Sequence, residues 1–347
     1  MKSHHGSTKS SRRILTMLQS LLLVIAFIHL ITGQVLPRKS ETDIEPPSYK
    51  VPSKYKSVEG YFQQTDDDIG DSDPQSIFNI KNFGLNSKYQ WSDIPGILDD
   101  LNDGDDIYKL LFLARHGEGY HNIAPTLYSD QEWECTYQMQ DGDASKGITW
   151  FDAELTDNGI AEIEKLASLW KSQINDQKTP IPSSFYVSPL SRTLHTYQLT
   201  WSSIVDSSSN PPTVKEYARE TYGLGTESKR HPKSYITSNF PFAKFEDGFS
   251  EQDVLWVSNK HESKQHRNYR ANLLLNDIFI NDKNSIISIT AHSGLIASIL
   301  KVVDHQKYPL ATGEVVPVLI KASNIKKFDM PDLDKAWKTL SDYCDSA

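Results

Sequence analysis

The chain has 347 residues, of which 38% are hydrophobic, so it is long enough to bury a large core. Its 36 basic against 45 acidic residues give a formal net charge of −9, which argues against a general nucleic-acid or anionic-membrane binder. The cysteines are Cys135 and Cys344, too few for a disulfide scaffold or a cysteine-rich zinc site. One disulfide and two unpaired thiols remain open alternatives.

The N-terminal segment 1–32 has the pattern of a signal peptide or signal anchor. Basic residues precede an apolar run at 14–31, which is the order of a secretory signal. We therefore expect a secreted or membrane-anchored protein, which would touch a membrane only through this segment if it is uncleaved. The chain has no Asn-x-Ser/Thr glycosylation acceptor, which argues against passage through the secretory pathway. A cytoplasmic location therefore remains the alternative.

The segment 33–57 is rich in proline and polar residues and is predicted to be a linker. The catalytic domain is expected over 58–347, with an aromatic-rich lead-in at 58–104 that packs on it. In chain order, the patterns then predict strands over 107–114, 184–188, 213–218, 285–291 and 315–321, and helices over 157–174, 189–204, 264–282 and 295–302. Segments 120–150 and 223–251 are predicted to be loops. This alternation predicts an α/β fold, a three-layer sandwich with a mostly parallel central sheet flanked by helices.

Reactive side chains follow the ends of the predicted strands. The first strand ends in Arg115-His116-Gly117, the next leads to Arg192, and later strands lead to Glu220 and His292. Because ligands bind beyond the carboxyl ends of strands in open α/β sheets, we expect these groups to converge. Arginine forks suit phosphate, a neutral imidazole can attack phosphorus, and a carboxylic acid can protonate a leaving oxygen. The pattern therefore indicates phosphoryl transfer.

The string Arg115-His116-Gly117-Glu118, with Asn122 five residues after Gly117, resembles the signature of the histidine phosphatase superfamily, in its phosphoglycerate-mutase-like branch. Four more motifs follow in the family's order, within a match that spans about 107–320: Leu155-Thr156 with Gly159, Ser188 to Thr193, Glu220 before Tyr222-Gly223, and Ala291 to Gly294. The upstream Gly60-Tyr61-Phe62 makes the fungal phosphomutase-homologue proteins the nearest resemblance and extends it to about residue 55.

The resemblance implies a phosphatase that hydrolyses phosphate monoesters of small molecules through a phosphohistidine on His116, with no metal and no cofactor. Arg115, Arg192 and His292 would bind the phosphoryl group, and Glu220 would donate the proton.

Four further residues are candidate substrate-binding groups. Asn122 would support the phosphoryl group, and Gly117 lets a backbone N–H approach it closely. His121 either lines the entrance or packs in the interior. Arg219 either attracts an anionic substrate or lies in a solvated loop.

Two other functions use the same residues. A phosphoglycerate-type phosphomutase would need further basic and polar groups for the substrate carboxylate, and none is identified here. A catalytically inactive phosphate-binding module is the other, and the complete set of His116, Arg192, Glu220 and His292 argues against it. The aromatic residues of 120–150 would form either a lid or ordinary core. No pattern indicates a particular oligomeric state.

Overall fold

The computed structural model describes residues 50–67, 72–327, 338–339 and 344, which all fall in one compact unit, Glu45–Ala347. The predicted signal or anchor at 1–32 lies outside the described residues. The helices are α2 (Gln63–Asp66), α3 (Ile94–Leu101), α4 (Tyr120–Ile123), α5 (Asp130–Cys135), α6 (Asp157–Gln177), α7 (Ser191–Trp201), α8 (Lys233–Asn239), α9 (Lys264–Asn281) and α10 (Ser293–Val302). The strands are β1 (Lys50–Ser57), β2 (Ile107–Arg115), β3 (Gly142–Asp143), β4 (Ile148–Thr149), β5 (Ser184–Val187), β6 (Thr213–Val214), β7 (Lys244–Phe245), β8 (Lys260–His261), β9 (Ile286–Ala291), β10 (Val315–Lys327) and β11 (Lys338–Thr339).

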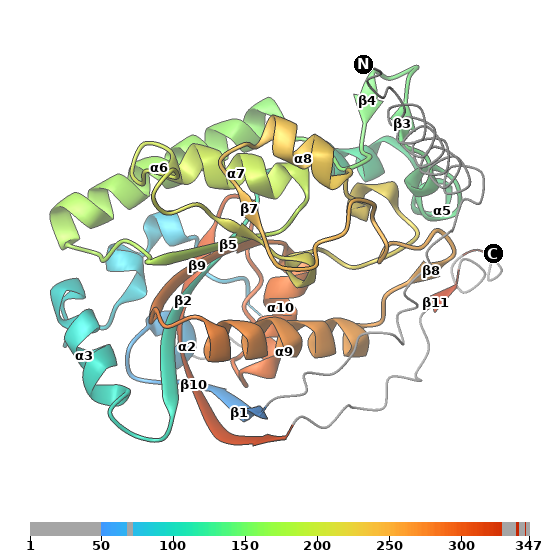
Figure 1. Ribbon diagram of the computed structural model, residues 1–347. Helices are drawn as coiled ribbons and strands as arrows, with labels where there is room; N and C mark the ends of the chain where they lie inside the picture. Colours follow the sequence, from blue (N-terminus) through green and yellow to red (C-terminus); the bar gives the residue numbers. More distant parts are fainter. Residues whose placement is uncertain (1–49, 68–71, 328–337, 340–343, 345–347) are drawn as a thin grey trace, which may run out of the picture. The chain divides into compact units, whose positions relative to one another are not determined.

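A seven-stranded sheet in the order β1-β10-β2-β9-β5-β6-β7 forms the centre of the fold (Figure 1). The five strands from β2 to β7 in this order pair in parallel, and β10 is antiparallel to both of its neighbours, β1 and β2. The predicted mostly parallel sheet is therefore confirmed. The parallel strands end at the same edge, which brings the residues that follow them together.

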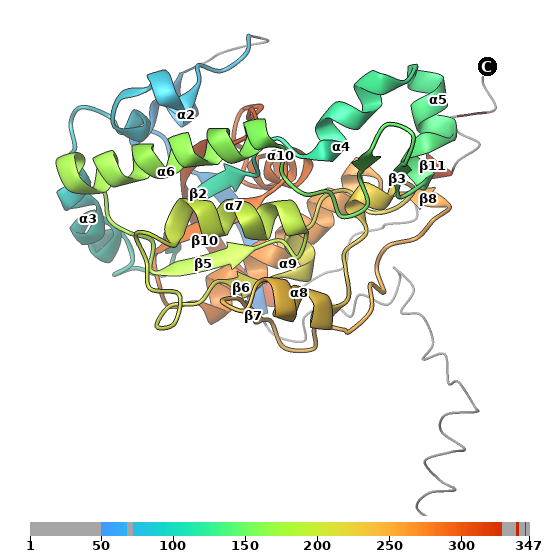
Figure 2. The same cartoon turned by 90° about the horizontal axis from the view of Figure 1, so that it is seen from above.

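Helices cover both faces of this sheet, as the sequence predicts for a three-layer sandwich. Figure 2 shows α6 and α7 over one face, while α9 and α10 cover the other (Figure 1). Strand β2 alternates between the two cores: Leu110 and Phe112 belong to the core under α6 and α7, and Leu111 and Leu113 to the core under α9 and α10. A strand buried on both faces reads as a continuous apolar run, which is why this strand is easy to recognise.

The lead-in 58–104 contributes to the core under α6 and α7. Phe62, Phe83 and Trp91 are each at most 1% exposed, and Phe83 packs its ring against Trp170 of α6 at a centroid distance of 4.6 Å. Burying aromatic surface of this size stabilises the fold, so the lead-in is an integral part of the folded unit.

Four local predictions differ from the structure. Segment 120–150, predicted to be a loop, contains α4, α5 and the short antiparallel pair of β3 and β4. Residues 50–57, placed in the linker, form β1, because they pair along the edge strand β10. The loop 223–251 contains α8 and β7. The strand expected over 213–218 ends at Val214, and a 3-10 turn at Glu216–Ala218 carries the chain to Glu220.

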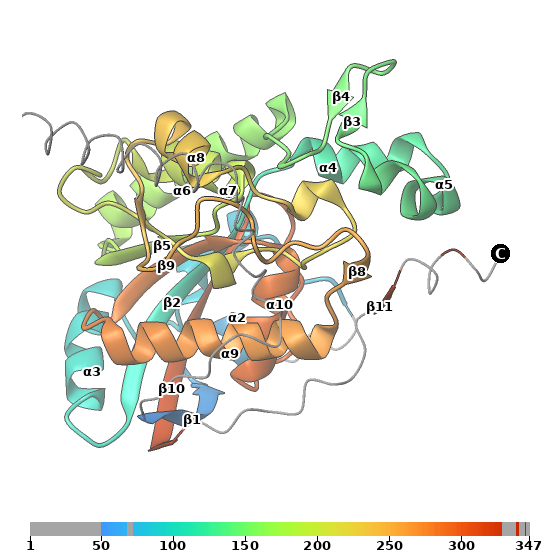
Figure 3. The ribbon, with the colours of Figure 1, turned by 45° about the vertical axis from the view of Figure 1, so that its right-hand side comes forward.

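The insert 120–150 projects from the layered core (Figure 3). Trp150 is fully buried in it, and Tyr128, Trp133 and Tyr137 pack around this ring as a small separate core. A disulfide joins Cys135 at the end of α5 to Cys344 near the C-terminus. Of the two alternatives for the cysteines, one disulfide or two unpaired thiols, the structure therefore has the disulfide. Over the described parts of the chain, no helix has both the length and the apolar character needed to cross a membrane.

Candidate active site

Two histidines meet at the carboxyl edge of the sheet. His116 follows β2 and His292 follows β9, and these neighbouring parallel strands pair Arg115 with Ala291. The two imidazole rings lie 5.0 Å apart between centroids. On the other side of β9, Ser188 follows β5, and its Oγ lies 2.8 Å from Nε2 of His292. The strand order thus creates this cluster from three distant parts of the sequence.

The ring of His116 is held in one orientation by its own backbone neighbour. Its Nδ1 lies 2.7 Å from the carbonyl oxygen of Gly117, and a carbonyl only accepts, so Nδ1 carries the proton and donates. The lone pair of the neutral imidazole is therefore on Nε2. Burial, together with the nearby Arg192 and Arg115, lowers the pKa of His116 well below 6.5. This side chain, 1% exposed, is set up as a neutral nucleophile.

Two arginines present unused donors in the same region. Arg192, at the start of α7, is fully buried; its Nη1 donates to the carbonyl oxygen of Glu227 over 2.8 Å. Arg115 donates from Nη1 to the carbonyl oxygen of Leu310 over 2.7 Å. Within the described part of the chain, Nε and Nη2 of Arg192 and Nε of Arg115 have no hydrogen-bond partner. Buried donors normally find partners, so these N–H groups are available to an anion.

His292 and His121 complete the ring of polar groups around His116. His121 lies in α4, with its ring centroid 5.1 Å from that of His116. Burial and the charge of Arg192 lower the pKa of both His292 and His121 well below 6.5. Among the described residues, Nδ1 of each has no partner. The sequence left open whether His121 lines the entrance of the site or packs in the interior. The structure places it against the cluster.

Glu220 reaches this cluster from the turn after β6. Its Oε1 accepts from the backbone N–H of Thr221 over 2.9 Å, and its Oε2 accepts from the N–H of Gly294 over 3.4 Å. Burial lowers the pKa of Arg115 and of Arg192, and the nearby carboxylate of Glu220 opposes this shift. Glu220 is thus brought together with the residues that the sequence predicted beside it.

Gly117 and Gly159 allow the nucleophile loop to lie directly on the start of α6. A Cβ on Gly117 would lie 2.5 Å from the carbonyl oxygen of Gly159, and a Cβ on Gly159 would lie 2.0 Å from that of Glu118. Thr156 caps α6 by accepting from the N–H of Gly159 over 3.0 Å. The side chain of Asn122 is used locally, accepting from the N–H of Gly119 over 2.9 Å.

The structure rules out the solvated-loop alternative for Arg219. Its side chain is fully buried and binds Asp253, with two N–H···O contacts of 2.7 and 2.6 Å. It also donates to the carbonyl oxygen of Ser228 over 2.6 Å. A buried bidentate ion pair of this kind has a structural role, so Arg219 does not lie in a solvated loop. Its role as a substrate-binding group stays a prediction.

Sequence reasoning missed the residues that hold Glu220. Arg270 of α9 donates to the carbonyl oxygens of Arg219 and Glu220 over 2.7 and 3.0 Å, and its charge is balanced by Glu262 at 2.6 Å. Burial opposes the ionisation of Glu262, but Arg270 and His266 outweigh it and lower the pKa of Glu262 to about 2. No motif marks these residues, and only the packing of α9 brings them to this turn.

Two more charged side chains at the site were also missed. Arg267 lies beside Glu220: a Cβ on Gly294 would be 2.3 Å from Oε1 of Glu220 and 2.8 Å from Nη1 of Arg267. Glu227 lies near Arg192, and burial raises the pKa of Glu227 to about 7 despite that positive charge. Within the described residues, no group of three or more His, Cys, Asp or Glu side chains has the arrangement of a metal site.

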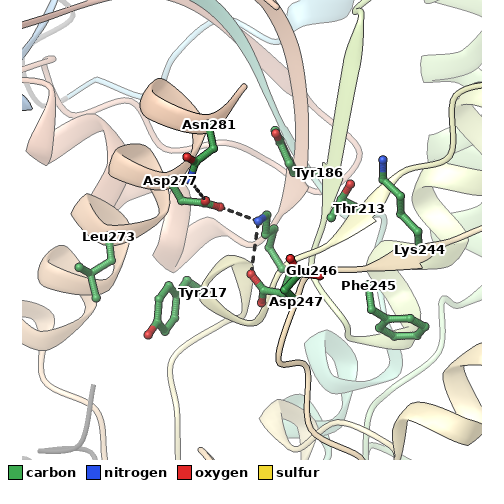
Figure 4. A pocket seen from close by; sticks show the side chains of 11 residues that line it. Tyr186, Thr213, Tyr217, Lys244, Phe245, Glu246, Asp247, Leu273, Asp277 and Asn281 are labelled. Atoms are coloured by element: carbon green, nitrogen blue, oxygen red, sulfur yellow. Dashed lines mark hydrogen bonds and ion pairs between the residues drawn. The ribbon is translucent and has the colours of Figure 1, made fainter. Parts of the chain in front are cut away.

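A cavity of about 560 Å³ opens beside these residues. Arg115, Ser293 and Gly294 line its inner end, and α10 and the loop 305–310 form its walls. A second hollow, of about 740 Å³, lies by β5, β6 and β7 (Figure 4). In that hollow Lys215 is bound by Glu246 and Asp277, and none of the clustered histidines and arginines lines it.

Known proteins are similar to this chain over most of its length. Over 294 residues the chain is 42% identical to "Phosphomutase-like protein 3" of Candida albicans, covering 84% of this chain and 87% of that protein. It is 38% identical over 287 residues to "Probable phosphoglycerate mutase" of Arthroderma benhamiae, covering 77% and 84%. Among solved structures, Bacillus stearothermophilus YhfR matches with 18% identity and a TM-score of 0.37, covering 60% of this chain and 89% of that one. No protein-family model matches the chain.

Proposed function

Because the chain belongs to the phosphoglycerate-mutase-like branch of the histidine phosphatase superfamily, we propose that it is a phosphatase of small-molecule phosphate monoesters, with His116 as its nucleophile. One observation carries the proposal: among the described residues, Nδ1 of His292 and several N–H groups of Arg192 and Arg115 have no hydrogen-bond partner, and they belong to the same cluster as an imidazole whose Nε2 holds the lone pair. Such donors stabilise the charge on the equatorial oxygens during phosphoryl transfer.

In the first step, Nε2 of His116 attacks phosphorus in line with the leaving oxygen. The N–P bond forms as the bond from phosphorus to the leaving oxygen breaks, and Glu220 gives its proton to that oxygen. Arg115, Arg192 and His292 hold the phosphoryl oxygens throughout. In the second step, water attacks the phosphohistidine, Glu220 takes a proton from that water, and the N–P bond breaks to release phosphate and restore His116.

A mutation series with residues 33–347 tests the proposal. Phosphate release from p-nitrophenyl phosphate is expected in EDTA for the wild type, because every step uses side chains of the chain itself. His116→Ala is expected to abolish release, since no other imidazole occupies its position at the end of β2. A folded wild-type protein that releases no phosphate from any monoester would overturn the proposal.

The same series tests the role of Glu220. Glu220→Gln cannot donate a proton, so release from phenyl phosphate, whose leaving oxygen is basic, should slow by about 10²–10⁴-fold. Release from p-nitrophenyl phosphate should slow far less, because its leaving group needs little protonation. Glu164→Gln, on the exposed side of α6, is the matched control and should change neither rate. An equal loss for both substrates would assign Glu220 a different role.

A phosphomutase is the second candidate, and a specific observation favours it. Arg267 supplies a basic group beside Glu220 of the kind that a substrate carboxylate would need, and relatives carry the name phosphoglycerate mutase. Incubation with 3-phosphoglycerate separates the two functions: a phosphatase yields inorganic phosphate, whereas a mutase yields 2-phosphoglycerate. Binding of phosphate with neither product would instead indicate an inactive binding module.

We also propose that segment 1–32 directs the chain into the secretory pathway. The Cys135–Cys344 disulfide supports this proposal, because disulfides persist in oxidising compartments and are rare in the cytosol. Fractionation of cells that express the whole chain, with N-terminal sequencing of the product, tests it. Recovery of the uncleaved chain in the cytosolic fraction would contradict it.

A further inference from the structure

We propose that the 560 Å³ cavity beside Arg115 holds the organic group of the substrate, and that this group has an apolar body and a second negative charge at its far end. The inference rests on the proposed function and adds the class of substrate to it. A volume of this size is typical of a small-molecule site.

The cavity adjoins the residues of the proposed reaction through Arg115 and Gly294. Arg115, Ser293 and Gly294 line it, and the N–H of Gly294 donates to Oε2 of Glu220. Glu220 must lie next to the leaving oxygen in order to protonate it. The group bonded to that oxygen therefore starts beside Gly294, at the inner end of the cavity.

The walls of the cavity are mostly apolar. One wall is the face of α10, and the other is the loop 305–310; their apolar members are Ile296, Ala297, Leu300, Tyr308, Pro309 and Leu310. Burying a ring or an alkyl chain against such walls is favourable because it removes apolar surface from water. Ala297 and Pro309 are the exposed members of these walls, and the other four are already buried.

The cavity also carries positive charge. Lys301 and Lys307 line it and are exposed, and among the described residues neither forms an ion pair. Lys301 is seven residues beyond Gly294 in α10, which places it about 10 Å along the helix from the inner end. An anionic group at that distance from the ester oxygen would meet the ammonium group of Lys301.

The lead-in holds the loop wall of this cavity in place. Nε2 of His305 lies 3.1 Å from Oγ1 of Thr65, and the side-chain amide of Gln306 donates to the carbonyl oxygen of Gln64 over 2.9 Å. The cavity is thus formed before substrate arrives, and a preformed site loses less entropy on binding. The hollow in Figure 4 differs, because Lys215, which lines it, is already neutralised by Glu246 and Asp277.

Three aryl phosphates test the inference on the protein 33–347. They are p-nitrophenyl phosphate, 4-butylphenyl phosphate and 4-(3-carboxypropyl)phenyl phosphate; the last two differ only by the distal carboxylate. The carboxylate probe should show the higher kcat/KM in the wild type. The double variant Lys301→Ala/Lys307→Ala should lower kcat/KM for that probe by about fivefold to tenfold and leave the other two within about twofold.

Two further variants complete the design. Ala297→Trp fills the cavity from α10 and should lower kcat/KM for both long probes while sparing p-nitrophenyl phosphate. Lys244→Ala removes a lysine from the other hollow and should change no probe. Circular dichroism shows whether each variant folds, and the lysine variants change only exposed side chains.

Each outcome has one meaning. Equal kcat/KM for the butyl and carboxylate probes in the wild type, or an equal loss on all probes in the double lysine variant, would overturn the inference while leaving the phosphatase intact. Absence of release from all three probes by the folded wild type would overturn the proposed function and the inference with it.

Discussion

At the scale of single residues, the ionisation of the buried histidines sets the expected pH dependence. Burial and two arginines lower the pKa of His116 well below 6.5, so its imidazole stays neutral where a free one is largely protonated. Activity should therefore persist as pH falls below 6.5 and decline only as pH passes the lowered pKa of His116. A profile of kcat/KM against pH should show its acidic limb below 6.5.

The substrate provides the control for this profile, because a phosphate ester has its own second pKa near about 6. Measurements with two esters whose second pKa values differ separate the two titrations. If the acidic limb lies at the same pH with both esters, it reports the titration of a group of the protein. A limb that moves with the ester, or one centred at or above 6.5, would contradict the assignment to His116.

At the scale of elements, the approach of the nucleophile loop to α6 depends on Gly159. A Cβ there would lie 2.0 Å from the carbonyl oxygen of Glu118, which is backbone and must shift. Gly159→Ala should therefore lower the free energy of unfolding by about 1–3 kcal/mol, the usual cost of overpacking. It should also reduce kcat, since the shift displaces the loop that holds His116. Urea unfolding and p-nitrophenyl phosphate turnover measure the two effects.

Gly96 in α3 is the matched control, because a Cβ there would have no atom within 4 Å. Gly96→Ala should stabilise the protein by about 0.4–1 kcal/mol, since alanine is the better helix former, and should leave kcat unchanged. If both variants shifted stability in the same direction by similar amounts, the close approach of Gly159 would not be the cause.

At the scale of the whole molecule, the disulfide closes a very long loop. Cys135 and Cys344 are separated by 209 residues, and the bond ties the insert 120–150 to the end of the chain. The double variant Cys135→Ser/Cys344→Ser should lower the free energy of unfolding by about 2–4 kcal/mol, mainly because the unfolded chain regains freedom. Denaturant unfolding of the oxidised proteins measures this difference.

A reducing agent supplies the control for the disulfide. In dithiothreitol the wild type should unfold at the same denaturant concentration as the double serine variant, and the variant itself should be insensitive to the agent. A wild type whose midpoint is the same with and without dithiothreitol would show that the bond contributes nothing to stability.

The layered fold, and the residues that gather at one edge of its sheet, could be predicted from the sequence. Apolar runs such as Ile107–Ala114 and the helical spacing within 157–174 reflect burial, which leaves a periodic pattern in one stretch of chain. Groups placed directly after such strands, above all His116 and His292, could be assigned to one edge, because parallel strands end together.

Elements and partners that depend on distant contacts could not be predicted from the sequence. Strand β1 forms because β10 offers it an edge, and β6 stays short because the 3-10 turn at Glu216–Ala218 interrupts it. Arg219 and Glu220 are adjacent, yet one pairs with Asp253 in the interior and the other reaches the site. Long-range packing sets these directions, and it leaves no periodic signal near either residue in the sequence.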